Sequence, residues 1–196
     1  MWGRFKTLDP LLFALPVVFS LVSVIFIYVL TVDAVGTNLV IRQGVAAALG
    51  FIGMLVLSFV DYRAWRAWRL WIYLICVLSL IAVLIVGDEI FGAKSWIDFG
   101  FIQFQPGEFA KLLLLLVLPA LLQVRSRFVG WRQFTVVGVA LVTVLGLVML
   151  QPDLGTTLVI AVLGITVFLT ARTSKIQKGV VIGLVALGIA TIGLSF

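Results

Sequence analysis

The sequence contains no histidine, a single cysteine and few charged residues. Of its 196 residues, 11% are charged and 63% are apolar, whereas about 25% of the residues in a soluble globular domain are charged. The absence of histidine excludes imidazole catalysis and histidine-based metal sites. Cys76 has no cysteine with which to form an intramolecular disulfide and lies inside an apolar run, so we interpret it as a small buried apolar residue.

The apolar content is too high for a soluble protein. Even a domain of about 150 residues buries only about 70% of the surface that its unfolded chain exposes. A hydrocarbon core about 30 Å thick is crossed by a helix of about 20 residues, and uncharged runs of about that length recur at 10–32, 43–60, 70–87, 133–152, 154–171 and 179–196. A further span, 107–124, contains only Glu108 and Lys111 as charged residues. We therefore predict an all-α fold, a polytopic membrane helix bundle with about seven transmembrane helices in one domain, 1–196.

The placement of basic residues predicts the orientation of these spans. Cytoplasmic loops are enriched in Lys and Arg, and with the N-terminus in the cytoplasm 11 of the 14 basic residues fall on that side: Arg4, Lys6, Arg63, Arg66, Arg69, Arg125, Arg127, Arg132, Arg172, Lys175 and Lys178. Tryptophans favour the headgroup zone, and five of the six lie near the same boundary: Trp2, Trp65, Trp68, Trp71 and Trp131. Because the charges sit in short clusters between apolar runs, we expect membrane lipids and no nucleic acid as partners. Phe196 lies inside the seventh run, so we expect the sequence to be truncated there.

The unusual polar residues gather on the predicted outer side, in the loop 87–106 and in the turn between the fifth and sixth spans. The candidate residues of an outer cavity are Lys94, Trp96, Gln105, Pro106, Glu108, Lys111, Gln151 and Asp153. They fall in three short strings: GAKSWID at 92–98, QPGEFAK at 105–111 and QPDLGT at 151–156.

Two interpretations of Glu108 and Lys111 remain open. Pro106 is suited to begin a helix, Glu108 then lies in the first turn, where the helix dipole favours a carboxylate, and Lys111 lies three residues further on the same face. In the structural interpretation, Lys111 extends outward to pair with Glu108. In the functional interpretation, Lys111 meets an anionic substrate group such as a pyrophosphate, because ionisable residues inside spans usually face a cavity.

The other two strings also have two interpretations each. Pro152 and Asp153 start a helix, either as a structural cap and turn or as part of a shaped outer cavity. Trp96 is either an interfacial anchor or a flat platform for a sugar ring or a lipid.

These three strings, at this spacing and on this topology, resemble the SEDS family, whose members include RodA, FtsW and SpoVE. The form of QPDLGT and the short loops are more similar to RodA than to FtsW. The resemblance implies a peptidoglycan glycosyltransferase that polymerises lipid II into glycan strands outside the bacterial cytoplasmic (inner) membrane and supports cell shape. It also implies about ten spans in the whole protein and a partner of the class B penicillin-binding type.

The resemblance assigns roles to individual residues. Trp96 matches the family's loop tryptophan, Glu108 and Lys111 match its buried, functionally required ion pair, and Asp153 matches its Gln-Pro-Asp turn. The family's catalytic aspartate lies in an outer loop beyond Phe196, so this chain alone is expected to be inactive. That aspartate would act as general base on the acceptor hydroxyl, while a basic residue or a divalent cation, Mg²⁺ or Mn²⁺, would stabilise the leaving pyrophosphate.

Two residues depart from the family pattern, which usually has arginine at the position of Ser95 and serine at that of Gly107. Lys94 is a candidate to replace the missing charge, without the bidentate geometry of arginine. Two other functions remain open: a lipid II flippase that uses Lys111 for transport, and a non-catalytic scaffold of the cell-wall machinery, for which Lys111→Ala would preserve function.

Overall fold

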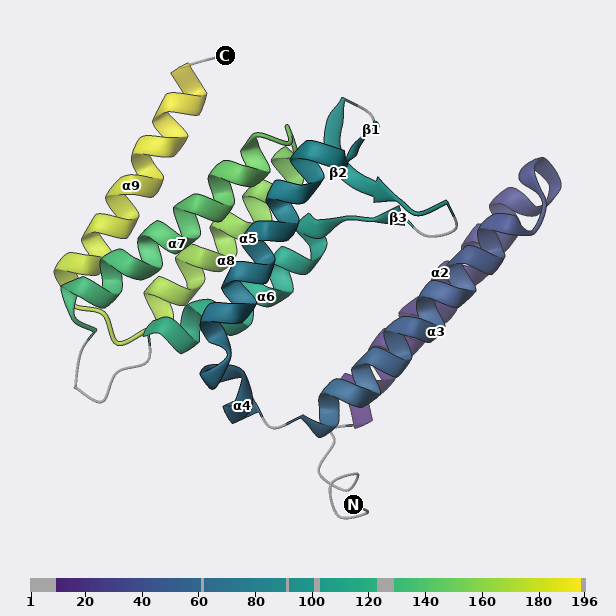
Figure 1. Ribbon diagram of the computed structural model, residues 1–196, viewed down its shortest axis with the longest axis horizontal. Coiled ribbons are helices and arrows are strands. Elements are labelled where there is room, and N and C mark those ends of the chain that lie inside the picture. The colour runs from purple at the N-terminus through teal and green to yellow at the C-terminus, as the bar shows by residue number, and fades with distance from the viewer. Residues whose placement is uncertain (1–9, 61, 91, 101–102, 123–128, 195–196) are drawn as a thin grey trace. The chain divides into compact units, whose positions relative to one another are not determined.

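The computed structural model describes residues 10–60, 62–90, 92–100, 103–122 and 129–194 (Figure 1). These residues form eight helices and a small three-stranded sheet. Because helix predominates and several helices are long and apolar enough to cross a membrane, the predicted all-α membrane-bundle class is confirmed, with the sheet as an addition to it. The chain divides into two compact units, 1–64 and 65–196, which we describe separately. Several residues used to predict the orientation lie outside the described ones: Trp2, Arg4, Lys6, Arg125 and Arg127.

The first unit contains a helical hairpin of α2 (Pro10–Val35) and α3 (Asn38–Phe59). The turn between them uses Gly36 with a φ of +75°, a left-handed conformation that glycine adopts without a steric penalty. A hydrogen bond from Gln43 Nε2 to Ser23 Oγ (3.0 Å) joins the two helices. No residue of α3 is buried, so the hairpin presents its apolar side chains outward.

The second unit is a helix bundle built around α6 (Pro106–Leu122). This helix packs against α5 (Arg69–Val86), α7 (Trp131–Met149) and α8 (Leu154–Thr170), while α9 (Lys175–Leu194) contacts α8 (Figure 1). The short α4 (Tyr62–Ala67) precedes α5. The core between these helices includes Cys76, Leu80, Ala110, Leu114, Leu118, Val137, Val144, Val148 and Ile160. The burial of Cys76 confirms its interpretation as a small core residue.

Three threonine side chains within the helices are satisfied locally. Thr143, Thr166 and Thr170 each donate a hydrogen bond to the carbonyl oxygen four residues earlier, at 2.9, 2.8 and 2.7 Å. An unpaired polar group is costly in lipid, where water is absent, so this local pairing makes threonine compatible with a membrane span. Across the described residues, every buried side-chain nitrogen or oxygen has a hydrogen-bond partner.

Each of the seven predicted spans contains a helix. Four described segments are long and apolar enough to cross a membrane, at Phe13–Val32, Asn38–Phe59, Arg69–Val86 and Trp131–Met149. Helices α6 and α8 have 17 residues each, which at 1.5 Å per residue is about 26 Å, somewhat less than the hydrocarbon thickness. Helix α3 begins at Asn38, before the predicted boundary at residue 43, and therefore contains Arg42, which was expected outside the span. Residues 38–42 include no glycine or proline to stop the helix there.

The predicted outer loop contains a small antiparallel sheet that the sequence reasoning did not identify. Its strands are β1 (Asp88–Ile90), β2 (Ala93–Asp98) and β3 (Gln103–Phe104), in the order β1-β2-β3. Asp88 lies opposite Trp96 in the first pair, and Ile97 lies opposite Phe104 in the second. Because β2 also contacts α5 and α6, the sheet is attached to one end of the bundle.

Candidate outer-end site

A hydrogen bond between two of the predicted strings defines the site. Gln105, immediately before α6, donates from Nε2 to Asp153 Oδ2 at 3.1 Å. Asp153 is the N-cap of α8, and its other oxygen, Oδ1, accepts from the Thr156 backbone N–H at 2.9 Å. Both carboxylate oxygens are therefore engaged, which confirms the cap and turn interpretation of Asp153. Helix α8 begins at Leu154, so Pro152 precedes the cap instead of starting the helix.

Gln151 is buried and ties the same turn to a third helix. Its side chain is 1% exposed, and its Nε2 donates to the carbonyl oxygen of Leu80 in α5 at 3.4 Å. This carbonyl therefore receives a side-chain donor from a residue 71 positions away. Gln151 thus holds α5 against the turn that carries Asp153, and a role in contacting substrate stays a prediction.

Glu108 and Lys111 form the expected ion pair at the start of α6. Lys111 Nζ lies 2.6 Å from Glu108 Oε1, and Glu108 is in the first turn of a helix that begins at Pro106, as predicted. The Glu108 side chain is 56% exposed and that of Lys111 is 21% exposed. The burial implied by the family resemblance is therefore not found within the described part of the second unit, because Glu108 lies on a face of α6 that the other described helices of this unit leave open.

The strand β2 positions Lys94, Ser95 and Trp96. Ser95 is 2% exposed, and its neighbours on both sides are half-buried. Lys94 Nζ is within 3.4 Å of the carbonyl oxygen of Ile85, near the end of α5, so its ammonium group is directed at a helix C-terminus. Cations are stabilised at that end of a helix. Lys94 therefore has a structural partner, and its substitution for a missing arginine stays a prediction.

Gly107 permits a close approach of α6 and α8. A Cβ at this position would lie 3.2 Å from Thr156 Cγ2, closer than ordinary van der Waals contact. Both Pro106 and Gly107 are buried, and Thr156 is 5% exposed. Gly107, at the position where the family usually has serine, therefore allows α6 and α8 to pack closely. These two helices begin directly after Gln105 and Asp153. The packing partner is Thr156, the last residue of QPDLGT, which was not among the predicted site residues.

The carboxylates of Glu108 and Asp153 are both engaged by groups of the protein, and a divalent cation at this end stays a prediction. Metal ions such as Mg²⁺ are bound by carboxylate and other oxygen ligands that are free to coordinate. Here Glu108 is paired with the ammonium group of Lys111, and both oxygens of Asp153 accept hydrogen bonds. In the described part of the chain, no three Asp, Glu, Cys or His residues gather closely enough to hold a metal ion.

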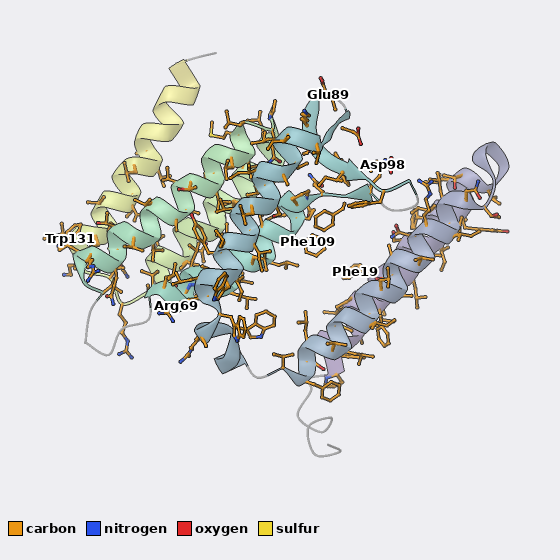
Figure 2. All side chains as sticks on the ribbon, in the orientation of Figure 1. Phe19, Arg69, Glu89, Asp98, Phe109 and Trp131 are labelled. Atoms are coloured by element: carbon orange, nitrogen blue, oxygen red, sulfur yellow. The ribbon has the colours of Figure 1, made fainter. Side chains whose placement is uncertain are left out.

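The two ends of the second unit differ in charge, although Lys94 and Lys111 lie at the end that carries the acidic residues. Figure 2 shows Glu89 and Asp98 at the end that carries the sheet, while Arg69 and Trp131 lie at the other end of the bundle. Asp98 accepts hydrogen bonds from Gly100 N and Gln103 Nε2, at 2.6 and 3.2 Å, and so closes the turn between β2 and β3. The separation agrees with the charge pattern from which the orientation was predicted.

The sequence matches the family of FtsW, RodA and SpoVE cell cycle proteins over residues 5–195. It is 32% identical over 174 residues to the peptidoglycan glycosyltransferase MrdB of Helicobacter pylori strain J99, an alignment that covers 86% of this chain and 44% of that protein. The chain therefore spans less than half the length of this relative.

Solved structures of proteins with related names also resemble this chain. The crystal structure of the rod shape determining protein RodA from Thermus thermophilus is similar with a TM-score of 0.70 and 31% identity, over 95% of this chain and 59% of that chain. A structure described as a peptidoglycan synthase complex that coordinates polymerization and crosslinking is similar with a TM-score of 0.70 and 32% identity, over 97% and 53% of the two chains.

Proposed function

This chain belongs to the FtsW/RodA/SpoVE family of cell cycle proteins, and from that premise we propose that it acts in a peptidoglycan glycosyltransferase. The proposed enzyme polymerises lipid II into glycan strands at the outer face of the bacterial cytoplasmic membrane, in support of cell shape. The observation that carries the proposal is the 32% identity to the peptidoglycan glycosyltransferase MrdB over 174 residues, and the 3.1 Å hydrogen bond between Gln105 and Asp153 joins two of the three family-like strings at one end of the bundle.

In the proposed reaction, the bond between the donor sugar and its lipid pyrophosphate breaks, and the acceptor sugar hydroxyl forms the new glycosidic bond. The hydroxyl proton passes to a general base, and the pyrophosphate leaves as an anion. Both oxygens of Asp153 accept hydrogen bonds within the protein, and Glu108 is paired with Lys111, so neither carboxylate is our candidate for that base. We assign the base to the aspartate that the family resemblance places beyond Phe196.

Lys111 is the candidate for stabilising the leaving pyrophosphate. A positioned cation lowers the free energy of a transition state in which negative charge develops. Glu108 holds the Lys111 ammonium group at 2.6 Å, and the 21% exposure of the Lys111 side chain leaves it accessible to an anion. Trp96, half-buried on β2 of the same end, is the candidate platform for a sugar ring.

The test is a polymerisation assay with the full-length protein that contains this chain and labelled lipid II. We expect Lys111→Ala to lower the rate of glycan-strand formation about a hundredfold, because it removes a cation that acts on the transition state. Lys111→Arg keeps the positive charge and should retain more activity. The matched control is Lys175→Ala, an exposed basic residue at the start of α9, which should polymerise at the unaltered rate.

The alternative functions predict different results in the same preparation. A scaffold would support cell-wall synthesis equally well with Lys111→Ala, and that outcome would refute the catalytic role of Lys111. A flippase would move lipid II across the membrane of vesicles without producing glycan strands. That result would refute the proposed polymerase activity.

We also propose a partner of the class B penicillin-binding type. The proposal rests on the structural similarity to a chain from a complex described as coordinating polymerization and crosslinking, since crosslinking requires a second activity. Copurification of a transpeptidase with the tagged full-length protein from native membranes tests it, and its absence after mild crosslinking would contradict it.

A further inference from the structure

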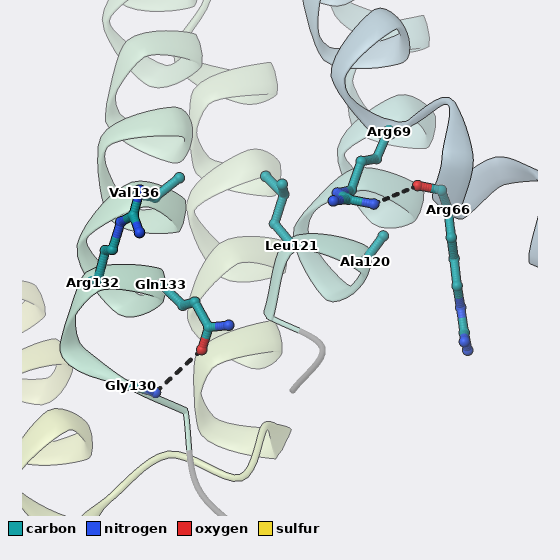
Figure 3. A pocket seen from close by; sticks show the side chains of 8 residues that line it. All are labelled: Arg66, Arg69, Ala120, Leu121, Gly130, Arg132, Gln133 and Val136. Carbon is teal, nitrogen blue, oxygen red and sulfur yellow. Dashed lines mark hydrogen bonds between the residues drawn. The ribbon is translucent and has the colours of Figure 1, made fainter. Parts of the chain in front are cut away.

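The end of the second unit opposite the sheet contains a basic cavity that the proposed polymerase activity does not use. The cavity has a volume of about 540 Å³ and lies between the region of α4 and α5 on one side and α6 and α7 on the other (Figure 3). The side chains that matter for its chemistry are those of Arg69, Arg132 and Gln133, with Leu121 and Val136 as apolar walls, and Arg66 also lines the cavity. The described lining residues include no carboxylate.

Two arginines are placed to bind an anion here. Arg69 is held at the rim by a hydrogen bond from Nη1 to the Arg66 carbonyl oxygen, at 2.8 Å. Arg132, on α7, makes no hydrogen bond or ion pair with the other described residues and is exposed. Figure 3 shows Arg132 on α7 and Arg69 on α5, with Leu121 of α6 between them, while the Arg66 side chain extends away. The positive charge of two helices therefore faces one cavity.

Gln133 and the start of α7 add donors. Gln133 Oε1 accepts from the backbone N–H of Gly130, the N-cap of α7, at 3.3 Å, which leaves its Nε2 group as a hydrogen-bond donor. The N-terminus of a helix also carries a partial positive charge. Guanidinium groups, an amide donor and a helix N-terminus together match the chemistry of a phosphate group.

The surroundings indicate that this phosphate belongs to a lipid. Trp68, Trp71 and Trp131 flank this end and are 61%, 61% and 53% exposed. Exposed tryptophans of membrane proteins lie at the headgroup level. Along α7, Val136 and Val139 are 52% and 61% exposed and continue the cavity wall as an apolar surface. A phospholipid with its phosphate in the cavity would lay its acyl chains against such a surface.

We propose that this cavity binds the headgroup phosphate of an anionic phospholipid. Basic pockets between transmembrane helices bind anionic headgroups, and on the predicted orientation this cavity faces the cytoplasmic leaflet. The site is distinct from the outer-end site and does not depend on the polymerase proposal. It also gives the arginines of this end a binding role in addition to their effect on orientation.

Native mass spectrometry of the detergent-purified protein tests the proposal, with phosphatidylglycerol and phosphatidylcholine as probes. We expect the unaltered protein to bind phosphatidylglycerol more tightly than phosphatidylcholine. The double variant Arg69→Gln/Arg132→Gln should weaken phosphatidylglycerol binding about 25-fold, about fivefold for each arginine near the lipid surface, and leave phosphatidylcholine binding unchanged. The matched control is Arg172→Gln/Lys175→Gln, which removes the same charge from residues that do not line the cavity.

Three outcomes would overturn the proposal. Equal losses in the two double variants would show a general effect of net charge, and equal binding of both lipids would show that no anionic site exists. Displacement of phosphatidylglycerol by millimolar inorganic phosphate would show a site for a soluble anion. If the double variant does not fold, Arg132→Gln alone still tests the site, because this side chain has no partner among the described residues, and a loss of about fivefold is expected.

Discussion

The two units contain equally apolar helices but bury them to different extents. The candidate spans of α2 and α3 have none of their residues buried, whereas 22% of the α5 span and 28% of the α7 span are buried. Lipid is as apolar as a leucine side chain, so apolarity alone gives helices little reason to associate in a membrane. Burial in the second unit depends on close packing, in which α6 contacts three other helices. Equal hydropathy therefore does not predict which spans form a core.

The sharpest test of this contrast replaces one leucine in each unit. Leu80 is fully buried in the second unit, and Leu30 in the first is 73% exposed. We expect Leu80→Ala to lower the free energy of unfolding by about 2–5 kcal/mol, because it leaves a cavity in a packed core. Leu30→Ala should have little effect, since it leaves no cavity. Thermal unfolding followed by circular dichroism in one detergent checks both variants, and similar losses would show that the two units are packed alike.

Replacing glycines should give effects of opposite sign in the two units. A Cβ at Gly87 would collide with the Val83 carbonyl oxygen and lie 3.0 Å from that of Trp96, at the junction of α5 and the sheet. Gly87→Ala should therefore destabilise the second unit by about 1–3 kcal/mol. A Cβ at Gly53, within α3, would have no such neighbour within 4 Å, so Gly53→Ala should stabilise its helix by up to about 1 kcal/mol. The melting temperatures should move in opposite directions, and a shared direction would contradict this account.

The smallest expected effect concerns the first turn of one helix in each unit. Asp153 accepts the Thr156 N–H as the cap of α8, whereas Thr37, the N-cap of α3, makes no such side-chain hydrogen bond. The lost cap should contribute about 1 kcal/mol to the cost of Asp153→Ala, which also removes the Gln105 hydrogen bond, and Thr37→Ala should cost close to nothing. Hydrogen exchange should show faster exchange of the Thr156 amide only in the first variant. Asp153→Asn keeps a capping oxygen and should preserve its protection.

The helix starts at the end that carries the sheet were predictable because their signals are local. Pro106 and Glu108 lie within the first turn of α6, and Asp153 is three residues from the N–H that it caps. The sheet was missed because strand pairing is decided by residues on different strands, such as Asp88 and Trp96. Aromatic and β-branched residues in that loop, with Gly92 and Gly100 at turns of positive φ, were a usable signal.

Membrane class, the approximate position of seven helices and the polarity of the two ends follow from the sequence alone. The reason is that the length of an apolar run and the sign of its flanking charges are properties of short segments. The contacts that make the sites were decided by the tertiary structure. Gln105 meets Asp153 across 48 residues, and Arg69 shares a cavity with Arg132. Such pairs depend on which helices pack together, and in an apolar solvent that choice is made by the fit of surfaces, which hydropathy does not encode.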